Sequence, residues 1–489
     1  MRWLKDKIVA SERGAALVWV AGTLVILLTT TALATDLGWI LLRNSQLQSA
    51  ADSAALAGVV NLPGFEAQAT LDATDAAGAN GFPIDGTTNL LDEALADNSY
   101  RVELTTTIDT FFLKLIGMDT FNLSQSATAQ YIKPVRLGSP DNTFGGPSNN
   151  FWAAINGRYT EIQQGDPYAS ECITHAANTP GCSGPTNGEY RPGGYYYGIE
   201  VAPGSSDLTV QIYDGGHYVE ETGNSYAGGT SGPGDSSWRW NWPSGQRGVE
   251  VEYRLYGPDQ TPTDPTDNVV NAPLHCSDKF PVISDDTPAS PSSQVAAGHL
   301  GGWTGDHTCT VSGALVAGVY VLQLPSPLYE GSSKFGIRAN VGSGPAPSAY
   351  GILDMSIYVN FNGGNAEPYL AEIRPEHAEK TLEVDIWDLG DVDGTGTIWF
   401  IPPDGPRPCT WTSTSSSFPS GSSATCTIDI SNQRFNAEWL YVSIPLDGYT
   451  CTLAGNGCWW RLHITTTAQA HDRTTWAARV TGDPVRIVD

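Results

Sequence analysis

The chain has 489 residues, a formal net charge of −27, 53 glycines and 32 prolines. This length allows several hydrophobic cores, and the acidic balance would repel a phosphate backbone, so we expect no nucleic-acid partner. The abundance of turn-forming residues favours β-rich domains over a helical bundle.

The amino-terminal end combines a basic segment with an uncharged apolar run. Residues 1–14 carry four cations (Arg2, Lys5, Lys7, Arg13) and two acids (Asp6, Glu12). Residues 15–35 are uncharged and, at about 1.5 Å per residue, can cross a hydrocarbon core of about 30 Å. We predict a transmembrane helix rather than a removed signal peptide, because the following sequence keeps a helical pattern. The basic segment places residues 1–14 in the cytoplasm and the bulk of the chain outside.

The helical pattern continues past Asp36 until the turn residues at 61–64. Ala50, Ala54 and Gly58 form a ridge of small residues, which allows another helix to approach closely. Two interpretations stay open: the ridge packs on a helix of another subunit, or it packs on the chain's own domain. Asp36, at the expected water boundary, either pairs with a cation of a neighbouring subunit or is solvated.

Residues 13–58 resemble the amino-terminal segment of TadG-like proteins of the Flp (Tad) pilus machinery. The matching features are Arg13-Gly14 before the span, Asp36-Leu37-Gly38 at its exit, and the block LQSAADSAALAG at 47–58. The resemblance reaches about residue 135 and implies a small pilin-like α/β module within 36–136. It also implies a bacterial cell membrane as the location and other pilus proteins or pilin-like helices as partners. Cleavage by a prepilin peptidase at Gly14 is left open, since Trp19 stands where an acid is usual.

The distal part of the sequence contains an internal repeat. Residues 137–190 are rich in Gly, Pro, Asn and Ser and are expected to form a connector. Beyond it, alternating strands recur in one order: 197–203 with 369–375, 208–214 with 382–388, 256–259 with 401–404, 318–322 with 438–442, 335–338 with 459–462, and 354–358 with 472–476. Such a pattern predicts two antiparallel, jelly-roll-like β-sandwiches, at 191–364 and 365–489. The expected fold class is therefore α+β, mainly β.

All eight cysteines lie beyond residue 170, and none forms a C-x-x-C pair. An even number of cysteines in an extracytoplasmic region predicts disulfides. The sequential pairing closes short loops and is the expected one: Cys172–Cys182, Cys276–Cys309, Cys409–Cys426 and Cys451–Cys458.

Two groups of residues are candidates for ligand binding. Asp388, Asp391, Asp393 and Thr395 are similar to the start of a calcium loop; the simpler interpretation is an acidic turn between strands. Trp238, Trp240 and Trp242 alternate along one strand and could stack on sugar rings, unless they pack in a sandwich core.

The sequence contains no G-x-S-x-G motif, no P-loop and no metalloprotease helix. We therefore predict no enzyme activity, no catalytic residue and no cofactor apart from the candidate calcium ion. The expected function is a single-pass, membrane-anchored Tad/Flp pilus-associated protein that acts in structure or assembly, as minor pilins do, through sandwiches displayed outside the cell. The alternative is a membrane-tethered module that binds glycan, cell wall or a host surface without a pilus role.

Overall fold

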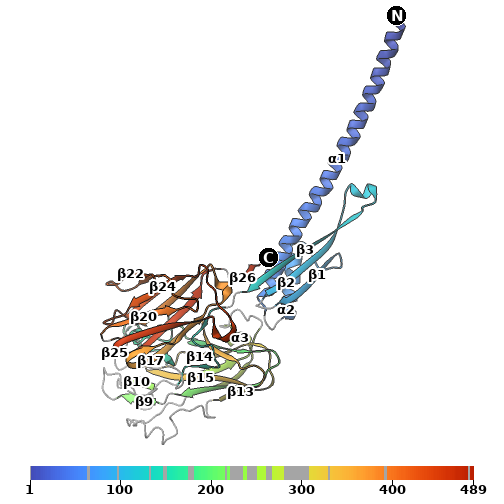
Figure 1. Cartoon of the computed structure of the whole chain (residues 1–489). Coiled ribbons are helices and arrows are strands. Elements are labelled where there is room, and N and C mark those ends of the chain that lie inside the picture. The colour runs from blue at the N-terminus through green and yellow to red at the C-terminus, as the bar shows by residue number, and fades with distance from the viewer. Residues whose placement is uncertain are drawn as a thin grey trace. The chain divides into compact units, whose positions relative to one another are not determined.

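The chain forms two compact units, shown together in Figure 1. Unit 1 comprises residues 1–132 and 485–489, and unit 2 comprises residues 133–484. The computed structural model describes residues 2–62, 66–95, 99–131, 134–146, 151–174, 181–214, 217–220, 235–238, 251–259, 267–279, 308–328, 331–389, 392, 394–482 and 485–488.

Unit 1 consists of a long helix and a small α/β module. Its helices are α1 (Arg2–Val59), α2 (Glu66–Ala79) and the short η1 (Leu113–Ile116). Its strands form one antiparallel sheet in the order β1-β2-β3-β26, with bounds Thr88–Leu95, Ser99–Asp109, Thr120–Tyr131 and Val485–Ile487. The predicted long helix and small α/β module are both present.

The core of unit 1 lies between the helices and one face of the sheet. The carboxyl-terminal half of α1 buries one face at helical spacing, through Leu47, Ala51 and Val59 among others. Helix α2 buries Ala69, Ala73 and Ala77, which recur every four residues. Strand β2 buries Tyr100, Val102 and Leu104, since alternate residues of a strand face the same side.

The regular structure in the described part of unit 2 is almost all β-strand, joined by turns and loops. Four short helices interrupt the strands: η2 (Ile162–Gln164), α3 (Asn268–Asn271), η4 (Pro375–His377) and η5 (Ala454–Asn456). The strands are β4 (Arg136–Leu137), β5 (Thr143–Phe144), β6 (Trp152–Asn156), β7 (Tyr195–Val201), β8 (Ser206–Asp214), β9 (His217–Glu220), β10 (Asp235–Trp238), β11 (Glu252–Tyr256), β12 (Leu274–Lys279), β13 (Thr308–Ala314), β14 (Gly318–Leu324), β15 (Ser332–Ser343), β16 (Ser348–Ile352), β17 (Asp354–Ala366), β18 (Tyr369–Glu372), β19 (Thr381–Leu389), β20 (Gly396–Ile401), β21 (Cys409–Ser413), β22 (Ser420–Ser423), β23 (Thr427–Asp429), β24 (Phe435–Pro445) and β25 (Trp459–Val480).

The strand pairings build two layers. One layer runs β13-β8-β15-β6-β17-β25-β19-β24-β21-β22, and the other runs β12-β11-β14-β7-β16-β4-β18-β25-β20-β23. These pairings are antiparallel; β9 and β10 form a parallel pair beside them. The 22-residue strand β25 belongs to both layers. Among the described residues, one large hydrophobic core, from Val135 to Ala478, fills the space between the layers, and a small second cluster contains Val321, Tyr350, Ile352 and Trp459. The predicted fold class, mainly β with sandwich-like antiparallel sheets, is confirmed.

The strand order also reveals which parts of the repeat are equivalent. Strand β14 lies between β7 and β11, just as the first part of β25 lies between β18 and β20. Strand β8 lies between β13 and β15, just as β19 lies between β24 and the second part of β25. The first three predicted correspondences therefore hold. The last three are displaced by one strand. By their neighbours, β13 corresponds to β24, β14 to the first part of β25, and β15 to the second part of β25. Two separate strands of the first repeat are thus merged into one strand in the second.

The region 137–190, predicted as a connector, is part of the sandwich. Strand β4 joins β16 to β18, and β6 joins β15 to β17, so this region links the two repeats in both layers. Its loop is organised by the buried carboxylate of Asp166, which accepts hydrogen bonds from the backbone N–H of Asn156 (2.7 Å) and Ala169 (2.9 Å) and from the hydroxyl of Tyr195 (2.6 Å). The sequence did not predict these strands because the region contains few long apolar runs.

The carboxyl-terminal boundary also needs correction. Residues 485–487, expected in the second sandwich, form β26 and pair with β3 of unit 1. Unit 2 is therefore connected to unit 1 at both of its ends.

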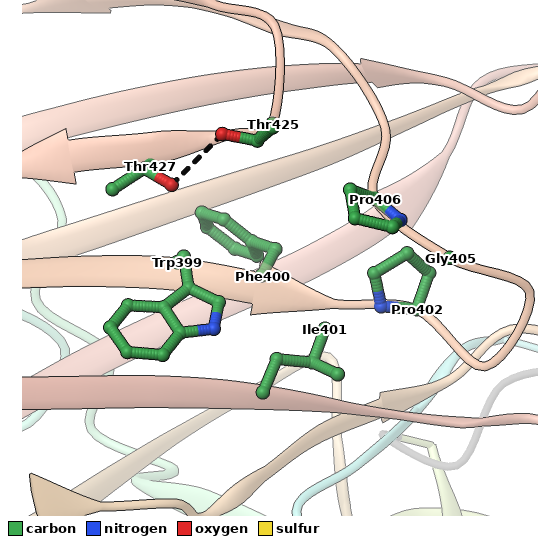
Figure 2. A pocket seen from close by; sticks show the side chains of 8 residues that line it. All are labelled: Trp399, Phe400, Ile401, Pro402, Gly405, Pro406, Thr425 and Thr427. Atoms are coloured by element: carbon green, nitrogen blue, oxygen red, sulfur yellow. Dashed lines mark hydrogen bonds between the residues drawn. The ribbon is translucent and has the colours of Figure 1, made fainter.

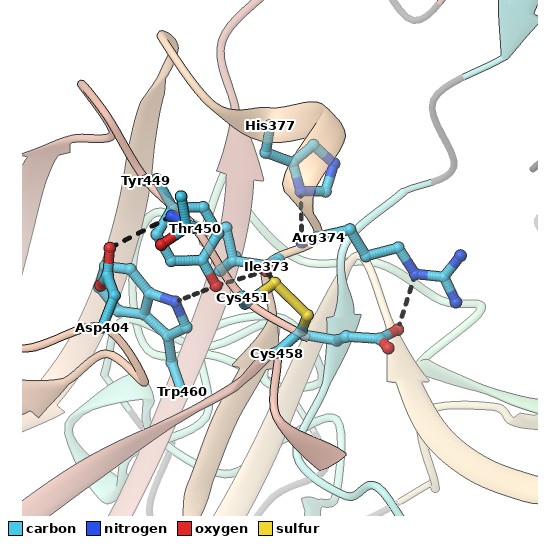
Figure 3. The surroundings of a disulfide bond; sticks show 10 residues. Ile373, Arg374, His377, Asp404, Tyr449, Thr450, Cys451, Cys458 and Trp460 are labelled. Atoms are coloured by element: carbon cyan, nitrogen blue, oxygen red, sulfur yellow. Dashed lines mark hydrogen bonds and ion pairs between the residues drawn. A yellow bond between two sulfur atoms is a disulfide. The ribbon is translucent and has the colours of Figure 1, made fainter. Parts of the chain in front are cut away.

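The four disulfides have the predicted sequential pairing. Two of them link the layers: Cys276 on β12 joins Cys309 on β13, and Cys409 on β21 joins Cys426, which directly precedes β23. The Cys451–Cys458 bond closes the turn before β25 (Figure 3).

The turn at Cys451–Cys458 is fixed by a chain of hydrogen bonds from Trp460 through Tyr449 to the Ile373 carbonyl. The Ile373 carbonyl accepts from the Tyr449 hydroxyl (2.6 Å), and the same hydroxyl accepts from Trp460 Nε1 (3.1 Å) (Figure 3). Burial raises the pKa of Tyr449 to about 12. These contacts indicate a structural role for this disulfide.

Removal of the Cys409–Cys426 bond should destabilise unit 2. The bond closes a loop with a sequence separation of 17, for which chain entropy predicts a loss of about 3 kcal/mol in the free energy of unfolding when both cysteines become Ala. Denaturant unfolding of the full chain in detergent, followed by tryptophan fluorescence, measures this loss. The signal reports mainly on unit 2, since only Trp3, Trp19 and Trp39 of the 15 tryptophans lie in unit 1. An unchanged midpoint would show that the bond does not constrain the layers.

Candidate membrane and assembly site

Residues 16–35 of α1 are turned to solvent along nearly their whole length in the part of the chain that the structure describes. Ala32 is the half-buried exception, and this region carries the apolar composition of a membrane span. Its five threonines, at 23, 29, 30, 31 and 35, each donate a side-chain hydrogen bond to a backbone carbonyl of α1 three or four residues earlier. Every threonine hydroxyl of this segment is thus satisfied within the helix, as a hydrocarbon environment requires.

Asp36 marks the point where α1 changes its environment. Its side chain is fully buried, and its carboxylate accepts three backbone hydrogen bonds, from the N–H groups of Phe111 (2.8 Å), Phe112 (2.9 Å) and Leu113 (2.6 Å). These donors open the short helix η1, whose first N–H groups have no partner within the helix. The prediction that Asp36 pairs with a cation of another subunit or is solvated is therefore wrong, because the module of the same chain supplies its partners.

The ridge of small residues packs on the chain's own module. Ala50 and Ala54 are fully buried in the core of unit 1, and a Cβ placed on Gly58 would lie 2.2 Å from the ring of Tyr100. This is the second of the two interpretations that the sequence left open. These three residues can therefore affect assembly only indirectly, by stabilising the module.

The ring of Tyr100 is held in place from its other end. Its hydroxyl donates to the Asp92 carboxylate at 2.6 Å, and the Thr70 hydroxyl donates to the same carboxylate oxygen at 2.6 Å. Burial raises the pKa of Tyr100, and the hydrogen bond to Asp92 raises it further. A ring so fixed cannot move away to admit a larger residue at position 58.

The two predicted ligand sites lie largely outside the described residues. Asp391, Asp393, Trp240 and Trp242 are not among these residues, and of Trp238 only the backbone is described, in β10. The buried Asp388 accepts the backbone N–H of Ala437 at 2.6 Å, and the Thr395 hydroxyl contacts that of Thr467 at 2.8 Å. Among the described residues no group of three His, Cys, Asp or Glu side chains could hold a metal ion. Calcium binding therefore stays a prediction.

A hollow on unit 2 has no counterpart among the predicted sites. It has a volume of about 500 Å³ and lies beside Trp399 on β20 (Figure 2). The residues that line it are Trp399, Phe400, Ile401, Pro402, Gly405, Pro406, Thr425 and Thr427. The Trp399 ring stacks on His463, with ring centroids 3.8 Å apart. The alternation of the strand was the available signal: Ile398 and Phe400 are buried, so Trp399 faces outward.

An added methyl group at Gly58 should weaken unit 1, whereas one at Gly38 should not. Gly58→Ala places a Cβ against the fixed Tyr100 ring, at an expected cost of about 1–3 kcal/mol. A Cβ placed on Gly38 would meet no atom within 4 Å, so Gly38→Ala is the matched control on the same helix. Hydrogen exchange of β2 amides in the full chain measures the effect, with about a tenfold acceleration for each 1.4 kcal/mol. Equal exchange in both variants would contradict the packing described here.

Comparisons with known proteins bear mainly on α1. The chain matches none of the curated proteins. One solved structure, the N-terminal CBM22-1-CBM22-2 tandem domain from Paenibacillus barcinonensis Xyn10C, aligns over 82% of this chain and 92% of that chain, with 8% identity and a TM-score of 0.15, a similarity too low to carry an argument. Residues 14–61, which include the span, Asp36 and the buried small residues, match the family described as putative Flp pilus-assembly TadE/G-like, and this confirms the resemblance of the amino-terminal segment to that family.

Proposed function

We propose that this chain is a membrane-anchored structural or assembly component of the Tad/Flp pilus machinery that displays unit 2 outside the cytoplasm. The observation that carries the proposal is the change of environment along α1. Within the segment that matches the pilus-assembly family, an exposed apolar half is followed without a break by a half that packs into a folded module.

The disulfides support the proposed orientation. All eight cysteines lie in unit 2 and form four bonds, which persist in oxidising compartments outside the cytosol. The cations of residues 1–14 favour a cytoplasmic amino-terminal end by the positive-inside rule. Both observations agree on a single-pass protein whose bulk is extracytoplasmic.

The role would be mechanical rather than catalytic. The small residues of α1 are used inside unit 1, so contacts with other pilus proteins or pilin-like helices would come from the exposed face of residues 16–35. In lipid, helices associate through packing and polar contacts, because the hydrophobic effect does not favour one helix over lipid tails. Unit 2 would provide the displayed surface.

Photo-crosslinking in cells tests the pilus role. A photoreactive residue in place of Leu24, which is 55% exposed in the span, should form adducts with other pilus proteins. The same residue at Leu71, 58% exposed on α2, is a control outside the span. Mass spectrometry identifies the partners. Adducts at position 24 that persist unchanged in a strain without the pilus gene cluster would refute the pilus role.

The hollow beside Trp399 favours a second candidate function, glycan binding by unit 2. An outward indole flanked by threonine hydroxyls offers an apolar face and polar groups, the two features that a sugar ring requires. This candidate does not depend on a pilus role.

Trp399→Ala should abolish retention of the full chain on immobilised bacterial polysaccharide if the hollow binds glycan. Tyr441→Ala is the control, because Tyr441 is an exposed aromatic residue on β24, away from the hollow. Retention is measured by affinity electrophoresis in detergent. Equal retention of both variants and the natural chain would exclude the hollow as the binding site.

A further inference from the structure

The loop between β2 and β3 carries an unusual set of exposed apolar side chains. We call residues 110–118 the apolar loop. Its exposed members are Phe111 (49%), Phe112 (44%), Leu115 (80%), Ile116 (73%) and Met118 (46%). Contiguous exposed apolar groups on a soluble surface mark a contact with another apolar phase or protein.

The apolar loop is held in a defined conformation by polar contacts behind it. Asp36 accepts the N–H groups of residues 111–113, and the Thr110 hydroxyl donates to the Met118 carbonyl at 2.6 Å. Gly117 closes η1 with a left-handed φ of 86°, which a glycine adopts without strain. The Phe111 ring meets the edge of Trp39 at a centroid distance of 5.6 Å. The fold therefore holds the apolar side chains of this loop in an outward position.

The same contacts place the apolar loop at the level where the membrane span ends. Asp36 directly follows the predicted span of residues 15–35, so the loop backbone lies at that boundary. Ala32, one turn earlier on the same face of α1, is the one residue between 16 and 35 that is half-buried. In Figure 1 the hairpin of β2 and β3 extends along α1 toward its amino-terminal end, beyond β1 and α2. The loop backbone at residues 111–113 therefore lies within about one helical turn, or about 5 Å, of the end of the span.

We propose that the apolar loop is a second membrane-contacting element, which inserts its side chains into the lipid leaflet at the exit of the span. Its position continues the apolar surface of α1, whose Leu33 and Leu37 are 55% and 53% exposed at this level. The aromatic pair Trp39–Phe111 matches the preference of aromatic rings for the membrane interface. The exposed Lys114 can extend its ammonium group toward lipid phosphates. The loop and the helix together would fix the tilt and rotation of unit 1 at the bilayer.

Fluorescence quenching of the full chain in vesicles tests this inference. All eight native cysteines are in disulfides, so Leu115→Cys provides a single site for an environment-sensitive nitrobenzoxadiazole label. The vesicles contain phosphatidylethanolamine and phosphatidylglycerol, with or without lipids that carry a doxyl quencher near the headgroup. Leu71→Cys on α2 is the matched control, since Leu71 is also an exposed leucine of unit 1.

The label at position 115 should emit at shorter wavelength than the label at 71 and be quenched several-fold more by doxyl lipid and less by aqueous iodide. Equal quenching by iodide at both positions would overturn the proposal. Protection at 115 from both quenchers would overturn it as well, because it would mean that a second copy of this chain covers the loop. A label at Val25→Cys, within the span, is the control for insertion of α1. Its quenching by lipid that carries the doxyl group deep in the acyl chain shows that α1 crosses the bilayer, whatever the loop does. The inference needs the membrane span but no pilus protein, and none is present in the vesicles.

Discussion

The structure of unit 1 depends on the carboxylate of Asp36 and its three backbone donors. An isolated carboxylate at the edge of a hydrocarbon layer is costly, and so are three unpaired N–H groups at the start of a short helix. Their mutual hydrogen bonds remove both costs. The same interaction ties the tip of the β2–β3 hairpin to α1 at the position where the helix loses its protein neighbours. One side chain thus sets the boundary between the membrane-facing and the folded part of the chain.

Unit 2 achieves its size by merging two repeats instead of placing two domains in series. Strands β4 and β6 bridge the repeats, one in each layer, and β25 passes from one layer to the other. The core is consequently continuous, and the Cys276–Cys309 and Cys409–Cys426 bonds hold the layers together toward their outer strands. A large surface can in this way be displayed on one folded body.

Sequence patterns captured the features that arise from local periodicity. The long helix, the antiparallel sandwich character and the sequential disulfides follow from residue spacing, and the structure confirms them. Features that depend on distant partners were missed or misjudged. The role of Asp36 requires residues 75 to 77 positions away, and the pairing of β26 with β3 joins segments more than 350 residues apart. The ridge at Ala50, Ala54 and Gly58 was expected to let another helix approach closely, whereas in the structure Ala50 and Ala54 lie in the core of the module and Gly58 lies against the ring of Tyr100.

The three-residue strand β26 has a mechanical consequence. The chain leaves β3 after Tyr131 and returns at Val485, and these two residues are direct neighbours in the sheet. A pull on unit 2 therefore loads adjacent ends of both strands and opens their bonds one after another, as in a zipper, instead of shearing them all at once. Because β26 is short and β3 is also paired to β2 along its length, β26 detaches first. Its release would leave unit 2 held through β3 alone, whose pairing with β2 is untouched.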